Sequence, residues 1–251
     1  MPLTRVDALR LLTSDPPRTG IFTDFDGTLS EIVDSPEDAT AVAGAESTLE
    51  RLAERFGLVA VVTGRALEDV RHRLHPAGVL LAGSYGRERS DRSEGRRQVE
   101  GWETVAAAAA AMTGELPGVV LEPKGAGVAL HYRTAPGFEP EVRRAAERLA
   151  GDFELEVLHG RLVVELVSPG PKKGDAIAAL VAERDLRTVL VAGDDVADVE
   201  AFEWVRRSRV RGVLVAVSSE EAPPTLEGAA DLVLDGPAEV VALLRDLLAA
   251  V

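Results

Sequence analysis

The chain of 251 residues contains no cysteine, which excludes disulfides, zinc–thiolate sites and catalysis by a thiol. It also contains no asparagine and only three lysines, Lys124, Lys172 and Lys173; with histidine counted as neutral, all its other cationic residues are arginine. Because the usual background of surface lysines is missing, each of these three is a candidate for point-charge chemistry.

Long apolar segments are missing too. No uninterrupted apolar run approaches the ~18 residues of a transmembrane helix, and residues 1–20 lack the apolar core of a signal peptide. The net charge of −14 weighs against binding to nucleic acid or to an anionic membrane. We therefore expect a cytoplasmic protein with no nucleic-acid, membrane or obligate protein partner.

What is present fits a globular fold, with 46% hydrophobic and 28% charged residues. The first part of the chain alternates strands with helices. Strands are expected at 20–23, 58–62 and 79–82, with helices at 46–56 and 66–74 between them. This order predicts an α/β domain with a parallel sheet and crossover helices.

The pattern changes after a charged stretch, 87–101, that is typical of a linker. Two helix-strand-strand units are expected next, with helices at 102–112 and 140–149 and strands at 119–122, 128–133, 155–158 and 162–166. Short turns between consecutive strands indicate antiparallel pairing. Residues 88–168 are thus predicted to form an α+β domain inserted in the α/β domain.

The strand–helix alternation resumes after the insert. Helices are expected at 174–184, 195–205 and 237–250, and strands at 188–192, 210–217 and 232–234. The predicted core domain therefore consists of residues 1–87 and 169–251, with polar loops at the carboxyl ends of its strands. In open α/β sheets these ends are where ligands bind.

An acidic loop, Asp24-Phe25-Asp26-Gly27-Thr28, follows the first strand. It does not match an EF-hand calcium loop, which needs glycine at position 6 and glutamate at position 12; counted from Asp24, those positions hold Leu29 and Ser35. Taken alone, the loop could also be an acidic turn without chemistry.

Further polar groups lie at other expected strand ends or helix starts: Thr63-Gly64-Arg65, Lys172-Lys173-Gly174 and Gly193-Asp194-Asp195. Each has an ordinary explanation by itself, as a helix cap or a solvated turn. Together they place a carboxylate pair, a hydroxyl, a lysine and a second carboxylate pair, in that order, at neighbouring strand ends.

This ordered set resembles the haloacid dehalogenase-like phosphohydrolases, whose core is a Rossmann-like parallel sheet. The insert resembles the cap of their sugar-phosphatase branch. Four longer stretches are similar to trehalose-6-phosphate phosphatases: residues 24–32, residues 83–88, His131-Tyr132-Arg133, and Gly193-Asp194-Asp195 with Ala201-Phe202.

The resemblance implies phosphate-ester hydrolysis. Asp24 would be the nucleophile that forms an aspartyl-phosphate. Asp26 would protonate the leaving oxygen and then activate water. Thr63 would donate a hydrogen bond to a phosphoryl oxygen, and Lys173 would neutralise the growing charge. Lys172 could exchange roles with Lys173, although the Lys-Gly pair favours Lys173.

The resemblance also implies Mg²⁺ as the cofactor, held by the Asp24 carboxylate, the Asp26 backbone carbonyl and Asp194. Asp195 would be a direct or outer ligand. A sugar phosphate is the implied partner molecule. Its expected contacts lie next to Thr63 and in the insert, and they are Gly64, Arg65, Lys124, His131, Arg133 and Glu165.

Four residues depart from the trehalose-phosphatase pattern. Tyr85 stands where histidine is common, Val167 where an arginine is expected, and Ala197 and Val199 replace threonine and glutamate. Alternatives therefore stay open: a phosphatase of another sugar or pseudo-sugar phosphate, a phosphomutase, or a silent sugar-phosphate binder. The Asp24–Asp26 pair argues against the binder, which needs neither a nucleophile nor an acid.

Overall fold

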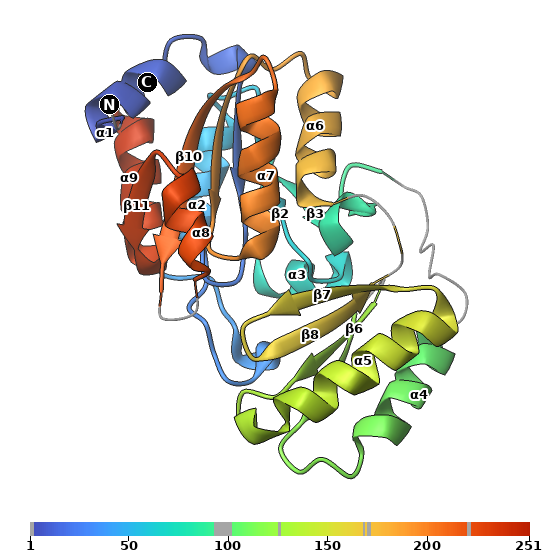
Figure 1. Cartoon of the computed structure of the whole chain (residues 1–251). Helices are drawn as coiled ribbons and strands as arrows, with labels where there is room; N and C mark the ends of the chain where they lie inside the picture. Colours follow the sequence, from blue (N-terminus) through green and yellow to red (C-terminus); the bar gives the residue numbers. More distant parts are fainter. Residues whose placement is uncertain (1–2, 93–101, 125–126, 168, 170–171, 220–221) are drawn as a thin grey trace. The chain divides into compact units, whose positions relative to one another are not determined.

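The computed structural model describes residues 3–92, 102–124, 127–167, 169, 172–219 and 222–251. The chain divides into two compact units, one of residues 1–92 with 171–251 and one of residues 93–170 (Figure 1). The boundaries between the units lie within five residues of the expected ones, which were 87/88 and 168/169. Most of the expected linker, from residue 93 to 101, lies outside the described residues.

The larger unit is built on a seven-stranded sheet that is parallel except at one edge. In spatial order the strands are β11 (Leu232–Asp235), β10 (Arg211–Ser218), β9 (Thr188–Gly193), β1 (Thr19–Thr23), β2 (Leu58–Val62), β3 (Leu80–Gly83) and β4 (Glu88–Arg89). Thr23 lies opposite Val61 of β2 and Ala192 of β9. The carboxyl ends of these three central strands therefore meet at one edge.

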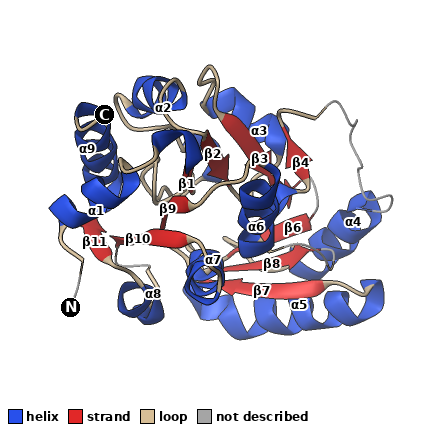
Figure 2. Cartoon of the chain, turned by 90° about the horizontal axis from the view of Figure 1, so that it is seen from above, coloured by secondary structure: helices blue, strands red, loops and turns tan. Residues whose placement is uncertain are grey.

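Helices cover both faces of this sheet (Figure 2). One face packs against α1 (Arg5–Leu12), α2 (Ala45–Ala53), α3 (Leu67–Arg73) and α9 (Gly236–Ala249), and the other against α6 (Lys173–Glu183), α7 (Val196–Arg207) and α8 (Pro224–Ala229). Side chains alternate between the layers, so Ile21 belongs to the first and Phe22 to the second. Such burial on both faces explains the continuous apolar runs in the sequence.

The smaller unit has a four-stranded antiparallel sheet in the order β5-β6-β8-β7, with two helices on one face. Its elements are α4 (Trp102–Thr113), β5 (Val120–Lys124), β6 (Gly127–His131), α5 (Glu139–Phe153), β7 (Glu156–Gly160) and β8 (Val163–Val167). The expected fold class, an α/β core with an α+β insert of two helix-strand-strand units, is confirmed.

Two short elements were not predicted. The strand β4 is two residues long and pairs antiparallel with β3, within a charged stretch that has no apolar alternation. The helix α8 has six residues and begins after Pro223, where the sequence looks like a loop. In the described part of the chain, no helix has both the length and the apolar character needed to cross a bilayer.

Candidate active site

Four of the predicted residues meet at the carboxyl edge of the larger sheet. Asp24 follows β1, Thr63 follows β2, Asp194 follows β9, and Lys173 begins α6. The Asp24 amide donates to the Ala192 carbonyl at 2.9 Å, so the β1–β9 pairing extends to the aspartate itself. All four side chains are buried, so this edge of the sheet carries a group of polar side chains that are largely removed from water.

Lys173 lies at the centre of the cluster, with 2% of its side chain exposed. Its Nζ is 2.7 Å from Asp24 Oδ2 and 2.7 Å from Asp198 Oδ1. Burial alone would lower the pKa of the Lys173 ammonium, but Asp198 and Asp24 outweigh burial and raise it. Lys173 is therefore a fixed positive charge, whereas Lys172 is half-exposed and pairs with Glu200 at 2.7 Å.

Asp24 is held on both carboxylate oxygens. Its Oδ1 accepts from the Phe25 amide at 2.6 Å, and its Oδ2 faces Lys173. Burial raises the pKa of Asp24 to about 6, against the attraction of Lys173 and with a further increase from Asp195. The carboxylate is thus oriented in advance, but its negative charge is costly without a further cation.

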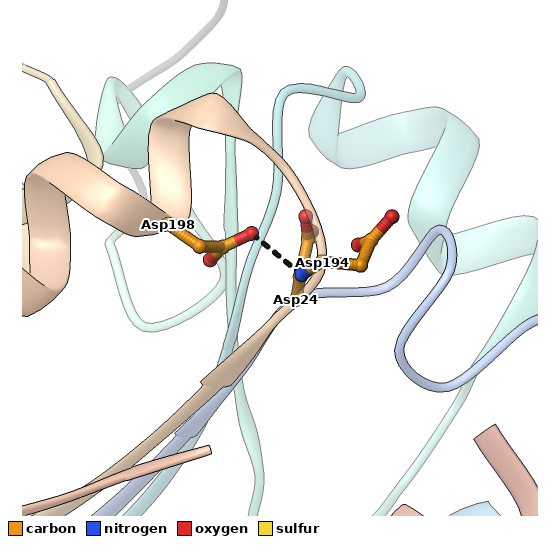
Figure 3. Close-up of side chains that lie close together, drawn as sticks. All are labelled: Asp24, Asp194 and Asp198. Carbon is orange, nitrogen blue, oxygen red and sulfur yellow. Dashed lines mark hydrogen bonds between the residues drawn. The ribbon is translucent and has the colours of Figure 1, made fainter. Parts of the chain in front are cut away.

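Three carboxylates could hold that cation. Asp24, Asp194 and Asp198 each offer an oxygen, and these atoms all lie within 4.8 Å of one another (Figure 3). Burial raises the pKa of Asp194, and the charges of Asp195 and Asp24 raise it further. Clustered, desolvated carboxylate oxygens suit Mg²⁺, which prefers oxygen ligands. The donor set therefore fits the implied metal.

Asp198 already has hydrogen-bond partners for both oxygens. It accepts from the Asp194 amide at 3.1 Å (Figure 3). It also accepts from Lys173 and from the Asp195 amide at 3.3 Å. Asp195 caps α7, accepting from the amides of Ala197 at 2.9 Å and Asp198 at 3.2 Å. The three-residue spacing of Asp195 and Asp198 is the sequence pattern of a capping box at the start of a helix. From the sequence, either Asp195 or Asp198 could be a direct metal ligand, and the structure places an Asp198 oxygen in the same cluster as those of Asp24 and Asp194.

The loop after β1 is shaped around Asp194. Gly27 has a φ of 64°, and a Cβ added there would lie 2.0 Å from Asp194 Oδ2. The Thr28 hydroxyl donates to Asp194 Oδ1 at 3.2 Å. Glycine is needed here for both its backbone conformation and its small size, and the neighbouring threonine fixes the carboxylate that approaches it.

Arg65 contacts Asp26 and not an open surface. Its Nε and Nη2 donate to the two Asp26 oxygens, each at 2.7 Å, and its Nη1 donates to Asp69 at 2.6 Å. A fourth bond runs from Nη2 to the Pro36 carbonyl at 3.0 Å. The Arg65 side chain is 5% exposed and that of Asp26 is 44% exposed. A buried arginine thus fixes a half-exposed carboxylate, whereas the sequence assigned Arg65 to the substrate.

Asp69 is a residue that the sequence analysis missed. Burial would raise its pKa, but Arg73 and Arg65 together lower it. The sequence could have indicated the Arg65–Asp69 ion pair, because the two residues are four apart and α3 begins between them. Thr63 is held as well: its Oγ1 accepts from the Arg65 amide at 3.2 Å, which leaves its O–H as a donor.

In the smaller unit, the predicted residues His131 and Glu165 share one face of the sheet. Glu165 pairs with Ala129, two residues before His131, and side chains alternate along a strand. Lys124 pairs with Gly127, which is two residues before Ala129 on β6, so the Lys124 backbone has the same register position as His131 and Glu165. The Lys124 side chain lies outside the described part. The opposite face carries the apolar residues that pack against α4 and α5.

His131 has a partner that the sequence did not indicate. Its Nε2 is 2.8 Å from Glu122 Oε2 on the neighbouring strand. Arg133 was expected within a strand, but β6 ends at His131 and Arg133 lies in the turn that follows. The chain turns after Tyr132, whose carbonyl accepts from the Ala135 amide at 3.0 Å.

Comparison with known proteins gives a consistent result. The family model for trehalose-phosphatase matches residues 22–238. A probable trehalose-phosphate phosphatase of Sinorhizobium fredii is 34% identical over 80% of this chain and 79% of its own length. A trehalose-phosphate phosphatase of Mycobacterium avium is 39% identical over 87% of this chain. The chain spans 59% of the length of that mycobacterial relative.

Solved structures agree. A trehalose-6-phosphate phosphatase related protein aligns over 92% of this chain and 97% of its own, with a TM-score of 0.75 and 26% identity. The C-terminal domain of the Candida albicans trehalose-6-phosphate phosphatase shares the fold, with a TM-score of 0.79 at 20% identity over 100% of this chain and 98% of its own. The chain belongs to the trehalose-phosphatase family.

Proposed function

We propose that this protein is a Mg²⁺-dependent phosphatase that hydrolyses a sugar phosphate, with trehalose 6-phosphate as its best substrate. The observation that carries the proposal is the buried Asp24–Lys173 pair at 2.7 Å beside Asp194. It joins a pre-oriented carboxylate, a fixed cation and an oxygen-rich metal position in one cluster. The family relatives named above supply the class of substrate.

The first step transfers the phosphoryl group to the protein. An Asp24 oxygen attacks phosphorus while the bond to the sugar oxygen breaks, and Asp26 gives its proton to that leaving oxygen. Lys173 and the Thr63 hydroxyl stabilise the charge on the phosphoryl oxygens. The products of this step are the free sugar and an aspartyl-phosphate at Asp24.

The second step returns the protein to its starting state. Asp26, now a carboxylate, takes a proton from water as the water oxygen attacks the phosphorus of the aspartyl-phosphate. The bond to Asp24 breaks and phosphate leaves. The ion pair with Arg65 supports the role of Asp26 as a base in this step, because it favours the carboxylate form and holds the half-exposed side chain in one orientation.

The metal would be held by Asp24, Asp194 and the Asp26 backbone carbonyl, with Asp195 as a direct or outer ligand. When bound, Mg²⁺ would screen the negative charges of the carboxylate and the phosphate ester. The protein's own part is to keep the carboxylates in place, which Gly27 and Thr28 do for Asp194.

The smaller unit is proposed to recognise the sugar. His131 and Glu165 carry groups that hydrogen-bond to hydroxyls, and Lys124 and Arg133 are the further candidates. Val167 shares the face of Glu165 but offers no donor or acceptor, so selection between sugars should be looser than with an arginine there.

The test is a screen of phosphate release over a panel of sugar phosphates, with Mg²⁺ and with a chelator. We expect the highest kcat/KM for trehalose 6-phosphate, loss of activity with the chelator, and no need for a bisphosphate primer. A requirement for the primer would indicate a phosphomutase. Efficient release from another sugar phosphate alone would leave only the phosphatase class standing, and no release from any would refute the proposal.

A further inference from the structure

The turn that follows β3 has an unusual backbone. Ser84 and Tyr85 have φ values of 49° and 53°, and Gly86 has 88°, so three consecutive residues are left-handed. This conformation is unfavourable for residues with a side chain. Ser84 is also 3% exposed, and its Oγ has no hydrogen-bond partner among the described residues. Such strain persists only where the surrounding structure maintains it.

The turn is fastened to the loop that carries Thr63. The Ser84 amide donates to the Arg65 carbonyl at 2.7 Å, and the Tyr85 amide donates to the Thr63 carbonyl at 2.9 Å. The Tyr85 ring covers Gly64, the residue between them. A Cβ added to Gly64 would lie 2.7 Å from Tyr85 Oη and 2.9 Å from its Cζ. Backbone bonds hold both ends of this loop, and the ring covers its middle.

On its other side the turn contacts the helix that begins with Lys173. A Cβ added to Gly86 would lie 2.5 Å from the Cβ of Ala176, which is three residues after Lys173 on α6. The turn therefore lies between the two elements that supply the Thr63 hydroxyl and the Lys173 ammonium. Both groups are proposed to hold the same phosphoryl oxygens.

We propose that Tyr85 is a positioning residue for the phosphate-binding loop, Thr63 to Arg65. Its ring, carried over Gly64 by the left-handed turn, holds the loop in the conformation that leaves the Thr63 O–H free to donate. The hydroxyl end of the ring lies over Gly64, since Oη, Cζ and Cε1 are the atoms nearest to the position that a Gly64 Cβ would take. This inference rests on the proposed function and assigns a role to one of the residues that depart from the family pattern.

The experiment compares Tyr85→Gly with Tyr85→Phe in the Mg²⁺-loaded protein. Tyr85→Gly removes the ring and suits the left-handed backbone, so we expect an equal or higher Tm. We also expect kcat/KM to fall about ten- to a hundred-fold, and the affinity for inorganic phosphate, measured by calorimetry, to fall with it. Tyr85→Phe keeps the ring and should stay within about two-fold of the wild type.

The matched control is Asp185→Gly. Asp185 is also left-handed, with a φ of 47°, but it is exposed and lies beyond the far end of α6. This variant should leave kcat/KM and phosphate affinity unchanged.

The proposal is overturned if Tyr85→Gly binds and releases phosphate as the wild type does, or if its activity falls only in step with a lower Tm. Equal losses in Tyr85→Phe and Tyr85→Gly would overturn the assignment to the ring. Failure of the proposed function would look different, as a wild type that releases no phosphate from any sugar phosphate. The calorimetric comparison would still decide the role of Tyr85.

Discussion

Withdrawal of the metal should make the stability of the protein depend on pH in an unusual direction. Asp24 has an ordinary pKa of 3.8, and burial raises the pKa to about 6 in the folded protein. At pH values between 3.8 and about 6, the folded state therefore binds more protons than the unfolded state. The stabilising effect of the protonated carboxyl is therefore complete below pH 3.8 and is lost as the pH rises through 6. Most surface carboxylates behave in the opposite way.

The size of the effect follows from the shift. A change from 3.8 to about 6 corresponds to about 3 kcal/mol between the two ends of the window. At about 2–4 °C per kcal/mol for a chain of this size, the Tm of the larger unit should fall by up to about 10 °C across the whole window in chelator. Between pH 5 and pH 7.5 only about one pKa unit of the shift is sampled, so the expected fall there is about 3–6 °C. Bound Mg²⁺ would offset the same charge, so its stabilising effect should be larger at pH 7.5 than at pH 5.

The assay is thermal unfolding at pH 5 and pH 7.5, in chelator and in excess Mg²⁺, for the wild type and for Asp24→Asn. The amide does not titrate, so the difference between the two proteins reports on Asp24 together with the groups that its charge affects, Lys173, Asp194 and Asp198. We expect this difference to change with pH in chelator and much less in Mg²⁺. A wild type whose Tm relative to Asp24→Asn is flat, or rises, from pH 5 to 7.5 in chelator would refute the reasoning.

Three further changes test other parts of the site. Lys173→Met removes the cation that two buried carboxylates share. We expect it to lower the free energy of unfolding, measured in urea, by about 3–5 kcal/mol, and to abolish turnover. The control Lys172→Met, at a half-exposed ion pair, should change neither. Gly27→Ala puts a methyl group 2.0 Å from an Asp194 oxygen. We expect the affinity for Mg²⁺, measured by calorimetry, to fall at least about ten-fold. An unchanged affinity would show that Gly27 does not shape the metal site. Val167→Arg adds a donor on the sheet face of the smaller unit and should raise the kcat/KM ratio of trehalose 6-phosphate over glucose 6-phosphate, and a lower ratio would contradict the proposed role of that face.

Local sequence patterns predicted the strands that carry this site and the residues at their carboxyl ends. Apolar runs placed β1, β2 and β9, and parallel strands must bring their carboxyl ends to one edge, so Asp24, Thr63 and Asp194 could be grouped before any coordinates. The elements that were missed, β4 and α8, are too short to show a period.

Contacts between distant segments could not be predicted in this way. Arg65 meets Asp26 because the loops after β2 and β1 lie side by side, and neither spacing nor composition indicates that pairing. The His131–Glu122 contact depends on the register of β5 and β6. Side-chain partners of this kind follow from the three-dimensional arrangement, whereas the capping pattern of Asp195 and Asp198 can be read locally.

The measurement that tests the central claim most directly is phosphate release from trehalose 6-phosphate in Mg²⁺, by the wild type and by folded Asp24→Asn. The account predicts multiple turnovers by the wild type and none by the variant, because the amide cannot attack phosphorus. Release by Asp24→Asn at the wild-type rate, with its fold verified by circular dichroism, would contradict the account.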